Sequence, residues 1–377
     1  MNPALFLNKQ LSYFAGTADE SPIHLFRAPA SPLFGHERAR IVLRRMEVLS
    51  WVFMILVPMW ILADMLIFPP EVVGPLVFGR LMATLFLGLL LVFSLVVMER
   101  ASWLVSYLSV LFLMAIPALF ELYAQPVFTA WQLTQPHISQ TQDAAIFLYR
   151  QLPIIYISGL ALFPMTLGES LPIALAITAI DAVVDMDGLN LNALHAAHWA
   201  GLWVVLVTGG TAVLAGVLQF NLLWQNHRLA DFDAETGLMK RAAAMDLLGW
   251  LWRDKSAVAR HISVGIMALP AAPAGAGDEP AQAKWLADEA ECLRQQLLPD
   301  MYGVRWSSRW FGVVSLGHTP RELDDLMNTM RGYAFAPVGT HGHRPVVVAE
   351  RLADQCVGPN NLLSTAERKL RQALASA

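Results

Sequence analysis

The sequence predicts a protein of two parts, a bundle of six transmembrane α-helices followed by a cytosolic α/β domain. Hydrophobic residues make up 56% of the 377 residues, and the mean hydropathy of +0.47 lies above the range of soluble proteins. These residues concentrate between about Val48 and Trp224, whereas the C-terminal part has an ordinary soluble composition. We expect a cytoplasmic N-terminal segment (1–46), a transmembrane domain (47–224), a helical stalk (225–232) and a cytosolic domain (233–377).

Each predicted membrane helix is an apolar segment near the length that a bilayer requires, since a hydrocarbon core about 30 Å thick needs roughly 20 residues. The six segments are 48–68, 78–98, 103–123, 146–167, 171–184 and 197–223, of which the fifth is the shortest. Basic residues predict the orientation, because they favour the cytoplasmic side. They are Arg38, Arg40, Arg44, Arg45, Arg100 and Arg228, and the loops at the opposite face contain no lysine or arginine. Both termini are therefore expected in the cytoplasm.

Ionisable residues inside the predicted membrane part form an intramembrane polar cluster toward its outer side. They are Asp64, Arg80, Glu121, Arg150, Asp181 and Asp185. Because charges are costly in lipid, they should pair or line a polar cavity. We expect an ion pair between Asp64 and Arg80, with a sensory pocket as the alternative. His195 and His198 are weak candidates for a metal site, and an interfacial histidine pair without metal is the ordinary interpretation.

The last apolar segment carries small residues at four-residue spacing, Thr208, Ala212 and Gly216, which allow another helix to approach closely. Internal packing is the expected role, and a dimer face is the alternative. Beyond them, steps of four and three typical of a coiled-coil seam follow at Leu218, Leu222, Gln225, Leu229 and Phe232. A stalk continuous with the last membrane helix would link the two parts of the protein.

Charge and cysteine content exclude several classes of function. The net charge is −4 and there is no long basic run, so a nucleic-acid partner is not expected. Cys292 and Cys356 are too isolated for a zinc site or a disulfide framework, which indicates reduced thiols. We expect no cofactor.

A β-hairpin is predicted in the second part. Two β-rich runs, Tyr302 to Trp306 and Trp310 to Leu316, flank the short segment Ser307-Ser308-Arg309. Trp306 and Trp310 would point to one face if both lie on strands of equal register. They would then form either a surface for protein contacts or part of the core.

The hairpin and three other segments resemble the GGDEF diguanylate cyclase domain. The stretch 233-DAETGLMKR-241 is similar to the entry motif D-x-L-T-G-L-x-N-R, and the hairpin is similar to R-x-G-G-D-E-F-x-V. Arg305, Phe311 and Val313 match this second motif, while Ser307, Ser308, Arg309 and Trp310 stand where Gly-Gly-Asp-Glu would stand. The helix signals at 319–331 and the stretch 362-LLSTAERKLRQAL-374 follow at the family's spacing, so the resemblance covers 231–377.

The resemblance implies a ferredoxin-like α/β fold, of the nucleotidyl-cyclase type, that has lost its chemistry. Family members hold metal ions with the acidic residues of the hairpin and with carboxylates after the first strand. Here arginine and tryptophan occupy the hairpin, and 266-IMALPAAPAGAG-277 offers no carboxylate before Asp278. Arginine has no acceptor and cannot bind Mg²⁺. The Asn-Asp pair with which the family reads guanine is also missing after the first strand, and the product-inhibition motif R-x-x-D would fall on Leu298 and Met301. The resemblance therefore implies that neither GTP nor cyclic di-GMP binds.

Together, these expectations predict a catalytically inactive, multi-pass protein of the bacterial inner membrane. It would act as a signalling or scaffold protein, through a protein partner or a homodimer, in a context such as cyclic di-GMP signalling or exopolysaccharide production that the resemblance implies. Its contact surface would be the vestigial signature loop from Arg305 to Phe311. The alternatives are an atypical active diguanylate cyclase, a GTP-binding sensor that uses Arg309 for phosphate, and a small-solute transporter with a regulatory domain.

Overall fold

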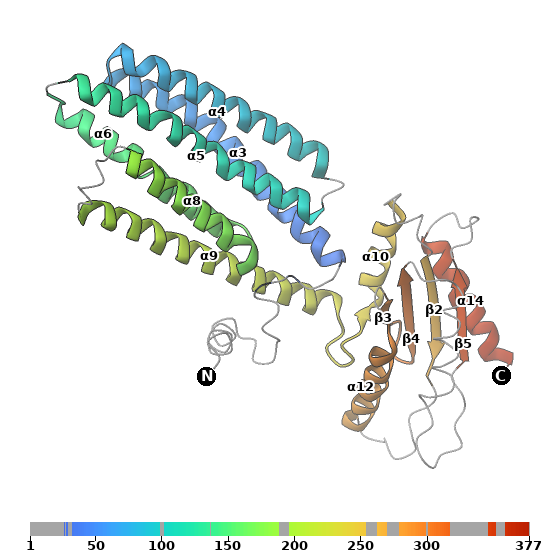
Figure 1. Ribbon diagram of the computed structural model, residues 1–377. Coiled ribbons are helices and arrows are strands. Elements are labelled where there is room, and N and C mark those ends of the chain that lie inside the picture. Colours follow the sequence, from blue (N-terminus) through green and yellow to red (C-terminus); the bar gives the residue numbers. More distant parts are fainter. Residues whose placement is uncertain are drawn as a thin grey trace. The chain divides into compact units, whose positions relative to one another are not determined.

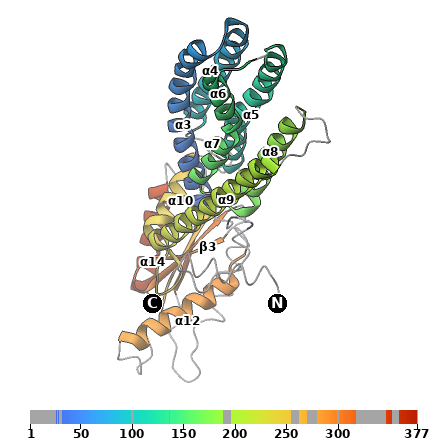
Figure 2. The same ribbon diagram turned by 90° about the vertical axis from the view of Figure 1, so that its left-hand side faces the viewer.

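The computed structural model divides the chain into two compact units, Met1–Gln225 and Asn226–Ala377. It describes residues 26, 28, 32–98, 102–135, 137–187, 196–253, 262–269, 279–298, 301–316, 346–351 and 359–376. Figures 1 and 2 show the helices of the first unit and the sheet of the second from two directions.

The first unit is built from helices. They are α3 (Pro32–Ile67), α4 (Pro70–Val97), α5 (Trp103–Thr134), α6 (Gln140–Arg150), α7 (Leu152–Ser158), a 3₁₀ turn (Gly159–Leu162), α8 (Leu167–Asp187) and α9 (Ala196–Asp231). Helices α3, α4 and α5 pack against one another and run side by side (Figure 1). Their buried faces form an apolar core with residues of α7, α8 and α9.

Five segments of this unit are long and apolar enough to cross a membrane: Leu33–Ile67, Pro70–Val97, Trp103–Thr134, Gln140–Leu162 and Gly201–Asp231. The N-terminal part of the chain therefore contains several long apolar helices compatible with a membrane region. The predicted fifth segment, 171–184, lies within α8, which does not belong to these five. A count of six spans stays a prediction.

Two helices differ from the predicted boundaries. Helix α3 begins at Pro32, well before the predicted start at Val48, because Phe34, Val42 and Met46 bury one face of an amphipathic first stretch. The fourth segment is broken rather than continuous. It changes from α6 to α7 at Gln151, just before Pro153, and then tightens into the 3₁₀ turn.

The second unit contains a five-stranded sheet. Its elements are β1 (Met239–Lys240), α10 (Arg241–Arg253), β2 (Ile262–Ala268), α12 (Glu279–Gln296), β3 (Met301–Arg305), β4 (Trp310–Leu316), β5 (Val346–Arg351) and α14 (Pro359–Ser376). The strand order is β1-β3-β4-β2-β5, with β1 parallel to β3 and the other pairs antiparallel. Strands β3 and β4 form the predicted hairpin, in which Arg305 is paired with Phe311.

Both faces of this sheet are covered, because every residue of β2 is buried. On one face, Phe311 and Val313 of β4 pack with Leu286 and Leu293 of α12. Helix α14 contacts β2 and β5. It buries a stripe of residues at four-residue spacing, Leu362, Ala366 and Leu370. The structure thus shows a mixed sheet with helices packed on it, and the finer ferredoxin-like assignment stays a prediction.

Candidate functional site

The entry turn of the second unit is held by the side chain of Asp233. Its Oδ2 accepts hydrogen bonds from the Thr236 backbone N–H at 3.0 Å and from the Thr236 hydroxyl at 2.8 Å. Gly237 follows with φ 63°, a left-handed conformation that suits glycine. The Gly237 N–H then donates to the Asp233 carbonyl at 2.8 Å, which closes the turn before β1.

Arg305 at the end of β3 joins the hairpin to this turn. Its guanidinium donates to Asp233 Oδ2 at 2.6 Å and to Glu235 Oε2 at 2.7 Å. The two segments that resemble GGDEF motifs, far apart in the sequence, therefore meet in space. Burial raises the pKa of Asp233, but the hydrogen bonds from Arg305 and Thr236 outweigh burial and hold that pKa below its usual value.

Trp306 is buried beneath the hairpin, with 4% of its surface exposed. Its indole N–H donates to Glu367 Oε1 of α14 at 2.7 Å, and the same oxygen accepts from Arg241 at 2.6 Å. The ring also lies against Gly312, where an added Cβ would be 3.0 Å from it. Trp306 therefore belongs to the core. The expectation that it forms part of a contact surface is wrong, because its indole is already covered and hydrogen-bonded.

The tip of the hairpin is exposed at Ser307, Ser308 and Arg309, and Trp310 is half-buried. The Arg371 guanidinium of α14 lies 5.9 Å from the centre of the Trp310 ring. Phe311, the next residue, is fully buried in the core against α12. The tip thus presents hydroxyl, guanidinium and indole groups and no carboxylate.

Glu289 is another described titratable group of this unit whose pKa is shifted. Burial raises its pKa to about 7, the hydrogen bond from Trp285 lowers it, and the nearby Asp288 raises it. Its Oε2 atom is buried without a hydrogen-bond partner among the described residues. This carboxyl group lies on α12 and is separate from the hairpin.

In the first unit, the structure brings Asp64 and Arg80 together. Arg80 Nε donates to Asp64 Oδ2 at 2.7 Å, and both side chains are buried. The Tyr149 hydroxyl of α6 donates to Asp64 Oδ1 at 2.5 Å and accepts from Arg80. Aromatic rings surround the guanidinium, with Phe120 at 5.1 Å and Trp60 at 5.9 Å. Helices α3, α4 and α6 are therefore joined by one satisfied polar group.

The other members of the predicted polar cluster differ in their surroundings. The Tyr156 hydroxyl of α7 donates to Glu121 Oε2 of α5 at 2.7 Å, and Glu121 and Asp181 are both buried. Arg150 ends α6 with an exposed side chain, so it does not belong to the buried group. The side chains of Asp185 and His198, and all of His195, lie outside the described residues.

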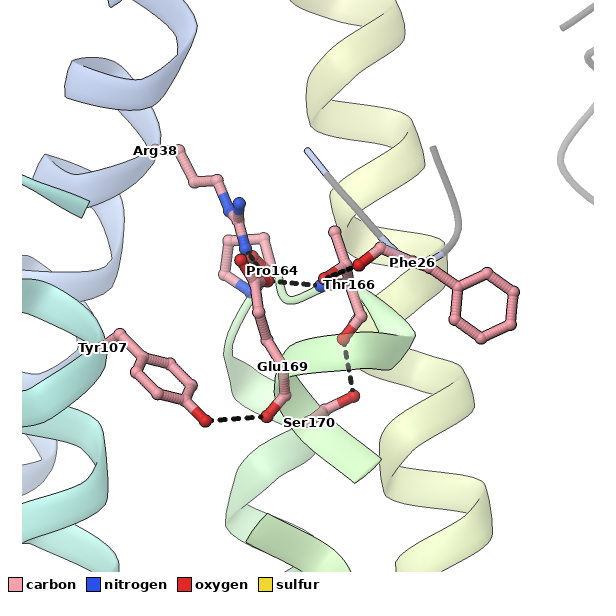
Figure 3. Close-up of polar contacts among 7 residues, drawn as sticks. All are labelled: Phe26, Arg38, Tyr107, Pro164, Thr166, Glu169 and Ser170. Atoms are coloured by element: carbon pink, nitrogen blue, oxygen red, sulfur yellow. Dashed lines mark hydrogen bonds and ion pairs between the residues drawn. The ribbon is translucent and has the colours of Figure 1, made fainter. Parts of the chain in front are cut away.

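Sequence reasoning missed a further buried ion pair, between Arg38 of α3 and Glu169 of α8 (Figure 3). Arg38 is 1% exposed, and its guanidinium lies 3.3 Å from the centre of the Trp103 ring and 4.7 Å from that of Phe220. Its Nε also donates to the Pro164 carbonyl at 2.9 Å. The sequence did contain a signal for this pair. Glu169 is a lone carboxylate between two apolar segments, and the predicted spans place it at the same membrane face as Arg38.

The polar contacts in Figure 3 extend to the turn that precedes α8. Glu169 Oε2 accepts from the Thr166 N–H at 2.8 Å, and the Tyr107 hydroxyl donates to the Glu169 carbonyl at 3.3 Å. The Thr166 hydroxyl donates to the Phe26 carbonyl at 3.4 Å. That carbonyl would lie 2.6 Å from a Cβ at Gly168, so the close approach requires glycine.

Side chains from α3 and α9 satisfy the backbone where the fourth segment ends. Gln219 Nε2 of α9 donates to the Ala161 carbonyl at 2.6 Å, and Arg45 of α3 donates to the Leu162 carbonyl at 2.5 Å. Arg45 also donates to Gln219 Oε1. Irregular backbone at membrane depth needs such partners, because lipid offers none. A Cβ added at Gly216 would lie 3.0 Å from the Phe163 carbonyl oxygen, so this small residue serves internal packing.

The structural neighbours of the chain are GGDEF domains. No protein-family model and no curated protein sequence matches the chain. The GGDEF domain of FimX from Pseudomonas aeruginosa is 18% identical, with a TM-score of 0.34, and the match covers 39% of this chain and 95% of that one. The GGDEF domain of DgcB from Caulobacter crescentus in complex with c-di-GMP is 12% identical, with a TM-score of 0.31 and coverage of 39% and 89%.

A third neighbour is the diguanylate cyclase SiaD from Pseudomonas aeruginosa, in complex with its activator SiaC. It is 15% identical, with a TM-score of 0.36, and the match covers 67% of this chain and 95% of that one. The neighbours agree with the resemblance that the sequence motifs indicated. With identities below 25% and TM-scores below 0.5, these neighbours carry no argument about function, so a functional proposal has to rest on the residues of this chain.

Proposed function

We propose that this chain is a catalytically inactive, membrane-bound signalling or scaffold protein of the GGDEF type that acts through protein–protein contacts. The observation that carries the proposal is the chemistry of the hairpin tip. Where the GGDEF motif would place its metal-binding acids, the chain has Arg309 and Trp310, and Arg371 lies over the Trp310 ring.

The reaction of a diguanylate cyclase sets strict demands on such a site. Joining two GTP molecules requires cations that neutralise phosphate charge, and hard cations require carboxylate or carbonyl oxygens. Three carboxylates that the structure describes beside the hairpin are already engaged, Asp233 and Glu235 by Arg305 and Glu367 by Arg241 and Trp306. Recruiting any of them to a metal ion would break contacts that hold the hairpin in place.

Helix α9 supports a role for the stalk. It runs without a break from Ala196 to Asp231 and so includes the predicted stalk up to its last residue but one. Leu222 and Leu229, one heptad apart, are 55% and 72% exposed. We therefore include in the proposal a homodimer formed through the stalk. The proposal also keeps six membrane spans, a bacterial inner-membrane location and both termini in the cytoplasm.

Turnover of GTP tests the proposal. Purified full-length protein with GTP and either Mg²⁺ or Mn²⁺ should form no cyclic di-GMP, measured by chromatography and mass spectrometry. A diguanylate cyclase assayed in the same buffer serves as the positive control, and heat-killed protein gives the background. Product above that background would refute catalytic inactivity. Binding of labelled GTP without turnover, lost in Arg309→Gln, would favour the GTP-binding sensor instead.

A further inference from the structure

Three exposed arginines lie around the hairpin tip and the adjoining face of α14. Arg309 precedes Trp310 in the tip, and Arg371 places its guanidinium 5.9 Å from the Trp310 ring centre. Arg368 is three residues before Arg371 on the same helix, a spacing that makes the two side chains neighbours. We call Arg309, Arg368, Arg371 and Trp310 the arginine patch.

The positive charge of this patch is not neutralised within the described part of the chain. Glu367, the acid of α14 closest to it in sequence, is bonded to Arg241 and Trp306. Asp233 and Glu235 are both bonded to Arg305. The ion pairs found among the described residues include none made by the three arginines of the patch. An anionic partner could therefore bind here without first displacing an ion pair between described residues.

We propose that the arginine patch is the docking surface for an acidic segment of a partner protein. This inference rests on the proposed function and names the chemistry of its partner. Arginine beside a half-buried aromatic is the composition enriched at protein interfaces. Complementary charge adds specificity and a faster association rate.

A membrane surface fits the patch less well than a protein does. Binding to lipid headgroups by a basic surface is strengthened by apolar side chains that enter the bilayer. The exposed large hydrophobic residues that the structure describes in this unit are Leu229 and Leu298, and neither belongs to the patch.

The experiment uses the full-length protein in detergent and a fluorescein-labelled oligoglutamate peptide, with oligoglutamine as the neutral probe. Fluorescence anisotropy should show binding of the acidic peptide alone, weakening as salt rises. The triple variant Arg309→Gln, Arg368→Gln, Arg371→Gln should bind about tenfold more weakly, equivalent to about 1.4 kcal/mol. Lys284→Gln, at an exposed position on α12, is the control for loss of a surface charge and should bind like the parent.

Three outcomes would overturn the inference. They are undiminished peptide binding by the triple variant, an equal loss in Lys284→Gln, and patch-dependent binding that phosphatidylserine vesicles, inorganic phosphate or GTP abolishes at lower concentration than the peptide. Thermal melts of each variant separate a lost surface from a lost fold. Cyclic di-GMP formation is measured on the same samples. Turnover would refute the proposed function, whereas lost peptide specificity without turnover would refute only the docking surface.

Discussion

The substitution Asp64→Ala tests whether the buried ion pair holds the first unit together. Asp64 and Arg80 have side chains that are 1% and 8% exposed, and they lie 2.7 Å apart. Removing the carboxylate leaves the guanidinium with Tyr149 as its polar partner among the described residues. It also removes the acceptor of the Tyr149 hydroxyl. The variant therefore loses two interactions and leaves one charge uncompensated in an apolar setting.

The structure allows the size of this effect to be estimated. Removing one partner of a buried ion pair costs about 3–5 kcal/mol. The aromatic rings of Phe120 and Trp60 remain within cation–π distance of Arg80 and retain part of the stabilisation. We therefore expect the lower value, about 3 kcal/mol, a change of roughly 140-fold in the unfolding equilibrium. For a unit of this size the melting temperature should fall by about 6–12 °C.

Thermal unfolding in detergent, followed by intrinsic fluorescence, measures the change. The series comprises the parent, Asp64→Ala, Arg80→Leu and the double variant, which should recover at least half of the loss because it leaves no unpaired charge. Arg150→Gln removes an exposed arginine at the end of α6 and should melt like the parent. If Asp64→Ala melts like the parent, or if the two single losses simply add, Asp64 and Arg80 do not stabilise each other.

Three further changes have defined outcomes in thermal melts of the full-length protein. Trp306→Ala should cost about 3–5 kcal/mol, because it empties a buried site, and no change would place the indole outside the core. Gln219→Leu should cost about 1–3 kcal/mol, because the Ala161 carbonyl loses its donor and Arg45 an acceptor; unchanged melting would contradict that contact. Glu289 has a pKa raised to about 7, above its unfolded value, so its protonated form stabilises the fold at low pH and this contribution is lost as pH rises through 7. The stability of Glu289→Gln relative to the parent should therefore rise between about pH 4.5 and pH 7 and level off above pH 7, and a constant difference across about pH 4.5 to pH 7 would exclude titration of this group.

The hairpin could be predicted from sequence because its signals are local. β-rich runs on both sides of Ser307-Ser308-Arg309 set the strands, and the observed strands agree with them to within one residue. The direction of Trp306 could not be predicted in the same way. Its surroundings include Glu367 of α14 and Arg241 of α10, which are distant from it in sequence and meet it only in the folded domain.

The start of α3 was missed for a different reason. A hydropathy window rejects the stretch before Val48, since Arg38, Arg40, Arg44 and Arg45 lower its mean. The stretch nevertheless has a helical period of buried residues, including Phe34, Ala39, Val42 and Met46. Arg38 continues this buried face, and its burial can be predicted only when its partner Glu169 is known. Amphipathicity, rather than mean hydropathy, was the useful signal at this boundary.

The residues that match the GGDEF motifs have different structural roles from the residues that depart from them. Among the matches, Asp233 and Thr236 bond to each other, Asp233 and Arg305 form an ion pair, and Phe311 and Val313 are fully buried. These roles are internal to the domain and need no ligand. The departures Ser307, Ser308 and Arg309 are exposed at the tip.

One further departure contacts a residue of another element. Trp310 replaces the glutamate of the hairpin motif, and the Arg371 guanidinium of α14 lies 5.9 Å from the centre of its ring. The contact between the indole and the guanidinium needs no metal ion, whereas a glutamate at this position could bind one. The domain therefore keeps the contacts that maintain its fold and replaces the groups that would face a nucleotide. The proposed loss of the reaction would leave this pattern, because packing and catalysis place their demands on different residues of the same hairpin.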